Sequence, residues 1–210
     1  MATRAWAVAV RVILFVLGVW LILGPFYFRY GWSPRLKAFK QSFEDDRVDA
    51  ANLRMSLVGF IDGRDPRMLS TIDAVKNYLV ADGLCYRYLG TDDGVPGGES
   101  AFVLCTFWLV NALLLAGRDD EAQKLFEKML SHGSNLGLFS EEIEASSGEF
   151  LGNYPQAFSQ IGVISSAVAL AHSAKVGSVA HEPAEQASKA RLGNGHKAGR
   201  GHRPAAARRG

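Results

Sequence analysis

The segment that says most about the fold is SAFVLCTFWLVNALLLAGRDDEAQKLFEKMLS, residues 100–131. Its apolar residues recur at the three- and four-residue spacing of a helix and do not alternate as they would in a strand. The spacing predicts helices at Ser100–Ala116 and Asp119–Ser131. Gly117 lies between them, and glycine is the residue that most often ends a helix. The middle of the chain is therefore predicted to be helical.

The same helical spacing extends outward over residues 35–174. It predicts further helices at Val48–Phe60, Met68–Val80 and Tyr154–Ala174, with turn residues between the segments: Gly63, Asp65, Pro66, Gly83, Gly133 and Gly137. The fold class predicted from this pattern is all-α. Two loops, residues 86–99 and 134–153, are longer and richer in polar and aromatic residues than helix turns require. Such loops on a rigid scaffold are where function tends to be found.

The two ends of the chain differ from this middle domain, residues 31–174. Residues 1–30 include seventeen uncharged positions, 12–28, which lie at the short limit of a membrane-spanning helix. We expect membrane contact there and a membrane-anchored protein if the segment inserts, otherwise a cytoplasmic one. A buried helix, or a start region from a misassigned reading frame, is the alternative. Residues 175–210 have almost no large apolar side chains, so we expect a disordered basic tail.

Charge and cysteine content narrow the function classes. Residues 35–174 carry 12 basic and 19 acidic side chains, which argues against a nucleic-acid groove, because phosphates require a basic face. The two cysteines, Cys85 and Cys105, are too few for a disulfide framework or a four-ligand zinc site. We therefore expect free core cysteines, no metal and no cofactor.

Ordered sequence blocks carry a family resemblance. They are GW (31–32), VDAANL (48–53), DGLCYRY (82–88), GVPGGESAF (94–102), CTFWL (105–109), LGLFSEE (136–142) and LGNYPQAFS (151–159). Over residues 31–172 the chain resembles the carboxy-terminal part of the catalytic domain of glycoside hydrolase family 15, the glucoamylase and trehalase-like group. The resemblance implies a partial (α/α)₆ toroid of the six-hairpin glycosidase type. It also implies an exposed apolar flank, and a partner that carries the amino-terminal half of the domain.

The resemblance places one catalytic residue. Enzymes of this family invert the anomeric centre with a general acid and a general base, held far enough apart to admit a water molecule. The base carries over onto Glu141, with Glu142 beside it. No counterpart of the general acid is visible in the matched blocks, and residues 1–30 contain no Asp or Glu. We assign Glu99 a binding role only.

The remaining candidates are substrate-binding residues. The Arg87 guanidinium has paired N–H donors that suit sugar hydroxyls or an ion pair. Tyr86, Tyr88 and Trp108 have aromatic rings of the kind that stack on sugars, although the helical spacing also suits Trp108 to the core. Asn153 and Gln156 offer amides, with helix capping as the alternative for Asn153. Two positions depart from the family pattern: Ser100 replaces a usual glycine, and Gln160 replaces a usual histidine.

The expected function is hydrolysis of α-glucosidic bonds in maltodextrin, isomaltose-type oligomers or trehalose. A truncated, non-catalytic remnant or a membrane-tethered carbohydrate-binding fragment is the main alternative. A helical protein with a membrane anchor and no sugar role is the third.

Overall fold

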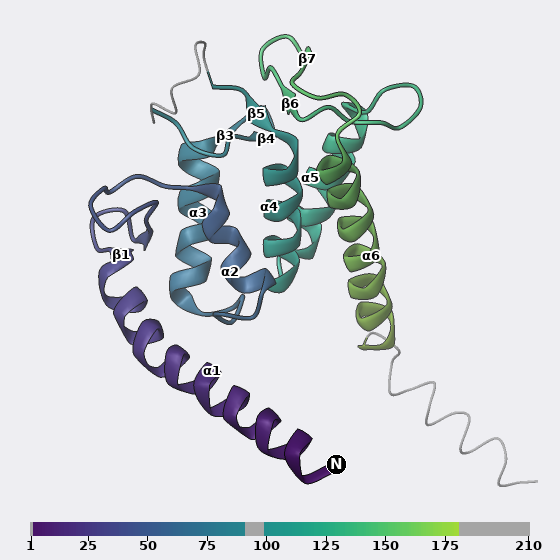
Figure 1. The fold of residues 1–210 in the computed structure, drawn as a ribbon. Helices are drawn as coiled ribbons and strands as arrows, with labels where there is room; N and C mark the ends of the chain where they lie inside the picture. The colour runs from purple at the N-terminus through teal and green to yellow at the C-terminus, as the bar shows by residue number, and fades with distance from the viewer. Residues whose placement is uncertain (1, 91–98, 181–210) are drawn as a thin grey trace, which may run out of the picture. The chain divides into compact units, whose positions relative to one another are not determined.

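The computed structural model describes residues 2–90 and 99–180 (Figure 1). Met1–Ala171 forms one compact unit, and the described residues of the second unit, 172–180, are the end of a helix. The longer helices are α1 (Ala2–Tyr30), α3 (Pro66–Leu79), α4 (Val103–Leu115), α5 (Asp119–Ser131) and α6 (Ala157–Ala180), with the 3₁₀-helix η1 (Ala50–Leu53) and the short α2 (Arg54–Leu57). The two-residue strands are β1 (Trp32–Ser33), β2 (Ala38–Phe39), β3 (Val80–Ala81), β4 (Leu84–Cys85), β5 (Ala101–Phe102), β6 (Glu142–Ile143) and β7 (Phe150–Leu151).

Helix α4 is the centre of the core. It contacts α5, α2, η1, α3 and β4, and the residues that it buries are Val103, Cys105, Thr106, Phe107, Leu109, Val110, Ala112 and Leu113. A helix that is apolar on nearly every side needs neighbours on nearly every side. The other elements of the domain are therefore arranged around α4.

The turn from α4 to α5 is fixed by Gly117. Its φ of +77° is a conformation that glycine adopts without steric cost. The Gly117 N–H donates to the Leu114 carbonyl (2.9 Å) and the Arg118 N–H donates to the Leu113 carbonyl (2.9 Å). This is a Schellman ending, which satisfies carbonyls at the end of α4 and reverses the chain into α5.

Helix α6 packs on α4 through small residues. A Cβ at Gly162 would lie 2.7 Å from Cδ2 of Phe107, so only glycine allows this approach. The buried Ser166 hydroxyl donates to the Phe107 carbonyl (3.4 Å). Ile161, Ile164 and Val168 are exposed on the outer face of α6, and Phe158 is exposed near its start. Helix α6 contains a segment, Ala157–Lys175, that is long and apolar enough to cross a membrane, judged by length and composition alone.

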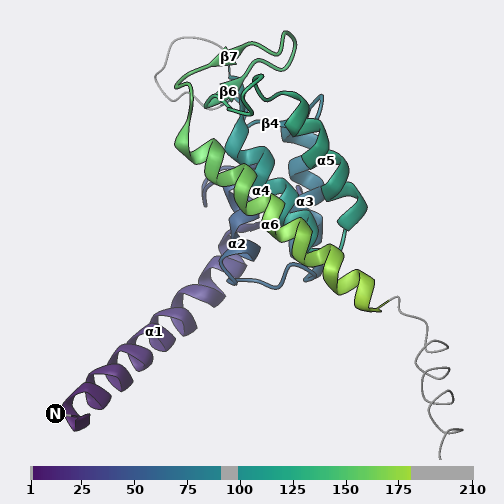
Figure 2. The same ribbon diagram turned by 90° about the vertical axis from the view of Figure 1, so that its right-hand side faces the viewer.

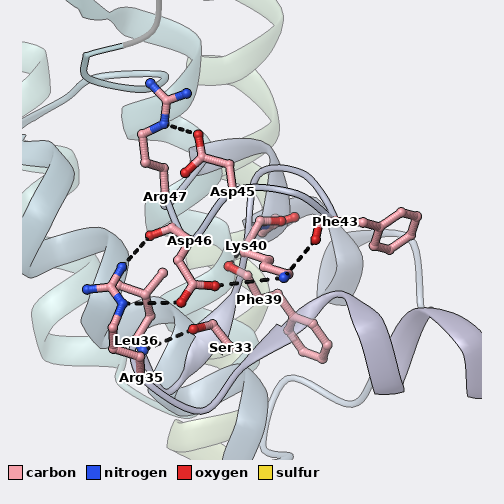
Figure 3. A network of polar contacts seen from close by, with 10 residues as sticks. Ser33, Arg35, Leu36, Phe39, Lys40, Phe43, Asp45, Asp46 and Arg47 are labelled. Carbon is pink, nitrogen blue, oxygen red and sulfur yellow. Dashed lines mark hydrogen bonds and ion pairs between the residues drawn. The ribbon is translucent and has the colours of Figure 1, made fainter.

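The segment between α1 and η1 is held by a polar network and an aromatic cluster. Asp46 pairs with Arg35 (3.2 Å) and Lys40 (3.7 Å), and the Arg35 guanidinium also donates to the Asp46 carbonyl (2.8 Å; Figure 3). A hydrogen bond from Ser33, with smaller contributions from Arg35 and Lys40, lowers the pKa of Asp46. Beside the network, the Tyr27 ring at the end of α1 stacks on Phe39 in β2, with the centroids 5.7 Å apart.

Strands β3–β7 lie together at one end of helices α3–α6 (Figure 1), and β4, β6 and β7 lie at the same end in the second view (Figure 2). β3 pairs with β4, and β5, β6 and β7 form an antiparallel three-stranded sheet. An isolated bridge between Tyr86 and Ala101 joins the segment after β4 to β5. The described ends of the first predicted polar loop, residues 86–90 and 99, therefore lie beside the second one at one end of the helices, and residues 91–98 of the first loop lie outside the described residues.

The structure confirms some of the predicted elements and corrects others. Asp119–Ser131 is helical with the predicted bounds, and α3 begins two residues before the prediction because Asp65 caps it and Pro66 occupies its first turn. The predicted helix Val48–Phe60 is wrong in extent: Asp49 is extended and caps η1, and the chain leaves helical geometry at Val58.

The other corrections concern strands and helix ends. The expected helix Ser100–Ala116 begins only at Val103, because Ala101 and Phe102 pair with β6. The expected helix Tyr154–Ala174 runs from Ala157 to Ala180, so residues 175–180 of the expected disordered tail are helical. The sequence there contains no proline before Pro183 to stop it. The domain is mostly helical, with short strands that the all-α prediction lacked. The rest of the expected tail, 181–210, lies outside the described residues.

The packing of α4 predicts that alanine substitutions at two phenylalanines will differ greatly in their effect on the free energy of unfolding. Phe107 is fully buried between Phe126, Phe139 and Gly162, so Phe107→Ala should cost about 3–5 kcal/mol of unfolding free energy. Phe158→Ala, on the exposed face of α6, should cost less than about 0.5 kcal/mol. Urea denaturation of the full chain measures both, and equal losses would contradict the described core.

Candidate glycosidase site

The candidate site lies where the short strands meet the first turns of α4 and α6. In the β5–β6–β7 sheet, Glu142 is opposite Phe102 on one side and Leu151 on the other. Glu141 directly precedes β6, and residues 151–156 lead from β7 into α6. The sheet therefore brings the LGLFSEE and LGNYPQAFS blocks together (Figure 2).

The backbone of Glu141 is fixed on both sides. Its carbonyl accepts from the N–H of Val103 (3.0 Å), the first residue of α4, and its own N–H donates to the Asn153 carbonyl (2.9 Å). First-turn N–H groups of a helix have no partner within that helix, so Glu141 supplies one from outside. The main chain at Glu141 is thus tied directly to the core helix.

Helix α6 holds the residues just before Glu141. The N–H of Gln156 donates to the Phe139 carbonyl (2.9 Å), and the buried Ser159 hydroxyl donates to the Ser140 carbonyl (2.8 Å). Ser140 is itself fully buried, and its hydroxyl donates to the Glu142 carbonyl (2.6 Å). The contacts from Gln156 and Ser159 at the start of α6, together with the Ser140 hydroxyl, therefore fix the position of residues 139–142.

The Glu141 carboxylate is held in place through one oxygen. Oε2 accepts from the Asn153 backbone N–H (3.1 Å) and from the Asn153 side-chain amide (2.8 Å). Gly152 makes room for it: its φ is +71°, and a Cβ there would lie 2.9 Å from Oε2. A half-exposed carboxylate held in this way is suited to take a proton from a bound water molecule.

Arg87, which follows β4, forms an ion pair, one of the two roles that the sequence left open for it. Its Nε and Nη2 donate to the two Asp49 oxygens (2.6 and 3.4 Å), and the Asp49 side chain is only 10% exposed. Asp49 also caps η1 by accepting from the Ala51 N–H (2.7 Å). The hydrogen bond to Asp49 raises the pKa of Arg87 above its ordinary value. The Arg87 guanidinium carbon lies 5.8 Å from the centroid of the Tyr88 ring.

The other predicted residues lie in different surroundings. Trp108, in the middle of α4, is half-buried, with the Arg54 guanidinium 5.2 Å from its ring centroid, so it packs within the helices. Glu99, Glu142 and Gln156 are half-buried at the strand end, whereas Asn153 is exposed and bonds to Glu141. α6 begins at Ala157, four residues after Asn153, so Asn153 does not cap it. Within the described chain, the buried Nε2 of Gln160 has no hydrogen-bond partner.

Sequence reasoning missed two residues that shape this site. Asp49 lies inside the predicted helix Val48–Phe60, but an aspartate near the start of a helical segment is an N-cap signal that could have moved the helix start and supplied the partner of Arg87. Gly152 belongs to the quoted LGNYPQAFS block, but its contact with Glu141 depends on a tertiary approach. No local pattern reports such an approach.

The two cysteines are buried and free. Burial raises the pKa of the Cys85 thiol to about 12 and raises that of Cys105 further. Both are therefore thiols near neutral pH, and a thiol is a poor nucleophile. Within residues 2–90 and 99–180, no group of three or more His, Cys, Asp or Glu side chains is arranged to hold a metal ion.

The fold matches that of solved glycosidases. A glutamate-to-alanine variant of a glycosidase aligns with a TM-score of 0.64 at 17% identity, over 74% of this chain and 44% of that one. A second glutamate-to-alanine variant, in complex with glucose, aligns with a TM-score of 0.63 over the same shares of the two chains. At this level of identity the likeness shows the fold alone.

The family follows from the sequence comparisons. The model of glycosyl hydrolases family 15 matches residues 25–168, and the chain belongs to that family. A trehalase of Thermoplasma acidophilum is 38% identical over 134 residues, which are 64% of this chain and 23% of the relative. A trehalase of Mycobacterium tuberculosis is 43% identical over 132 residues, which are 62% of this chain and 19% of the relative. The chain thus spans about a fifth of the length of these curated relatives, which fits a carboxy-terminal part of the catalytic domain.

The contact between Gly152 and the Glu141 side chain predicts a difference between Gly152 and Gly148, which lie on either side of β7. Gly148 and Gly152 both have a positive φ, so alanine at either should cost about 1–2 kcal/mol of unfolding free energy. A Cβ at Gly148 meets nothing within 4 Å, whereas one at Gly152 displaces the Glu141 carboxylate. Gly152→Ala should therefore cost about 1 kcal/mol more.

Urea denaturation of the two variants measures that difference. In a Glu141→Ala background the extra loss at Gly152 should disappear, because the displaced side chain is gone. An extra loss that persists in this background would show that the carboxylate does not rest on Gly152.

Proposed function

We propose that this chain carries the general-base side of a glycosidase site that hydrolyses α-glucosidic bonds, with trehalose as the first substrate to test. The observation that carries the proposal is the Glu141 carboxylate, which is held by Asn153 and Gly152 at the strand end of the domain. The relatives at 38% and 43% identity are trehalases, and this supports trehalose over maltodextrin and isomaltose-type oligomers.

The proposed reaction is a single displacement with inversion. Glu141 takes a proton from water while the water oxygen bonds to the anomeric carbon. The bond from that carbon to the glycosidic oxygen breaks, and a general acid on the opposite side protonates the departing oxygen. The two carboxyl groups must be roughly 6.5–9.5 Å apart to admit the water. We assign the acid to the amino-terminal half of the toroid, carried by a partner, because the matched blocks contain no counterpart.

The structure favours particular roles for the remaining candidates. Tyr88, Glu99, Glu142 and Gln156 are assigned to sugar contacts, since they are half-buried at the same end as Glu141. Arg87 is assigned to holding Asp49, and Trp108 to packing with Arg54. The apolar outer face of α6 is assigned to contact with further helices of the six-hairpin toroid, because such a stripe on a water-facing helix otherwise exposes a continuous apolar surface.

Complementation tests this function. The full chain is co-expressed with the amino-terminal half of the Mycobacterium tuberculosis trehalase, and glucose release is assayed on trehalose, maltose, isomaltose and maltodextrin. We expect little release by the full chain alone and release by the pair. Glu141→Gln should lower the rate by at least about 10²-fold, whereas Glu149→Gln, an exposed glutamate of the same segment, should leave it unchanged.

Two outcomes would count against the proposal. Release that survives Glu141→Gln would remove Glu141 from the chemistry. No release by the pair, with sugar binding retained, would favour a carbohydrate-binding role without turnover.

We further propose that α1 anchors the protein in a membrane. Residues Val12, Leu14, Phe15, Leu17, Leu21 and Leu23 are each at least half exposed, and at 100° per residue they point to all sides of the helix. A helix that is apolar on all sides and not covered by protein suits a lipid environment. Seventeen uncharged residues, 12–28, are about enough to span the hydrocarbon layer.

Membrane flotation tests the anchor. The full chain should float with lipid vesicles and resist carbonate extraction, and the double variant Leu14→Lys/Leu17→Lys should be released. The matched control places the same charges on the other apolar helix, as Ile161→Lys/Ile164→Lys in α6, and should remain bound. Release of the α6 variant with retention of the α1 variant would identify α6 as the membrane-binding element.

A further inference from the structure

Three hydrogen bonds join Glu141 and Asn153. The Glu141 N–H donates to the Asn153 carbonyl (2.9 Å), and both the backbone N–H and the side-chain amide of Asn153 donate to Glu141 Oε2 (3.1 and 2.8 Å). The two residues are twelve apart in sequence and are brought together by the turn between β6 and β7. Each residue thus fixes the other through main-chain and side-chain atoms.

The arrangement distinguishes the two carboxylate oxygens. Both Asn153 donors meet Oε2, so within the described residues Oε1 is the oxygen left to accept a proton. A half-exposed glutamate that lacked these bonds would occupy several rotamers of comparable energy. Displacing a reacting group by about 1 Å can cost as much as roughly 10²-fold in rate.

We infer that Asn153 is a positioning residue of the site, which holds Glu141 through Oε2 so that Oε1 faces the reacting water. This inference rests on the proposed function of Glu141 as general base. It differs from the sequence-based assignment, in which Asn153 binds the sugar, because one N–H of the Nδ2 group and the backbone N–H both donate to Glu141.

The first test measures the contact and does not depend on activity. In the full chain, the backbone and side-chain amide resonances of Asn153 are followed by NMR while the pH is lowered enough to protonate carboxylates. Both should shift as Glu141 loses its charge, since an amide bonded to a carboxylate senses that charge. In Glu141→Gln the shifts should disappear, and in Glu144→Gln they should remain. Asn153 resonances that titrate unchanged in Glu141→Gln would overturn the inference.

The second test separates positioning from direct sugar binding. The probe is 1-deoxynojirimycin, a cationic glucose analogue whose charge resembles that of the glycosyl transition state. Asn153→Leu keeps the branched shape of the side chain and removes its N–H donors without adding a charge beside the cationic probe. We expect about tenfold weaker binding from loss of a hydrogen bond to a charged group. Asn135→Leu, the same change at an exposed loop position, should leave the affinity unchanged.

The cycle is completed in the Glu141→Gln background. If Asn153 acts through Glu141, Asn153→Leu should have no further effect there. An equal tenfold loss in both backgrounds would overturn the inference and return Asn153 to sugar binding. Absence of any affinity for the analogue in the wild-type chain would count against the proposed function alone, because the amide resonances decide the Glu141–Asn153 contact separately.

Discussion

The burial of α4 is the constraint on which the rest of the domain depends. A thirteen-residue helix with apolar side chains on nearly every face can exist in water only when other elements surround it. The turn at Gly117 places α5 on one side, and the close approach at Gly162 places α6 on another. The position of the candidate site then follows from where α4 begins.

The site and the core share hydrogen bonds. The first N–H of α4 donates to the carbonyl of Glu141, and the start of α6 holds Phe139 and Ser140 through Gln156 and Ser159. A catalytic carboxylate on a loop is usually less well defined than one on a helix. Here the loop has little freedom, because α4 uses the Glu141 carbonyl to satisfy its first N–H, and Gln156 and Ser159 at the start of α6 donate to Phe139 and Ser140. The half-exposed position of Glu141 is therefore compatible with a fixed main chain.

Local sequence signals predicted the parts of the fold that depend on local physics. Periodicity alone placed Asp119–Ser131 with its observed bounds, because the segment is amphipathic and ends in helix-stopping residues. It failed at residues 48–60, where Asp49 turns its side chain to the backbone and breaks the helix, and at Ala101 and Phe102, where a cross-strand partner forty residues away decides the conformation. Strands of two residues are too short to give an alternating pattern.

The sequence also predicted the candidate site only in part. Resemblance to the family pointed to Glu141 and its neighbours, and the structure brings Glu141 and Asn153 into direct contact. The resemblance could not show that Asn153 donates to Glu141, that Arg87 pairs with Asp49, or that Trp108 lies beside Arg54 among the helices. These roles depend on which of several polar partners is nearest in space.

Glucose titration of the isotope-labelled full chain, followed by amide NMR, would show whether the strand end of the domain binds sugar. We expect saturable shifts confined to the described strand end, residues 84–90, 99–102 and 139–156, and their loss in Gly152→Ala, which displaces the Glu141 side chain. Shifts centred on the outer face of α6, or no saturable shifts at any residue, would contradict the claim that this end of the domain is a sugar site.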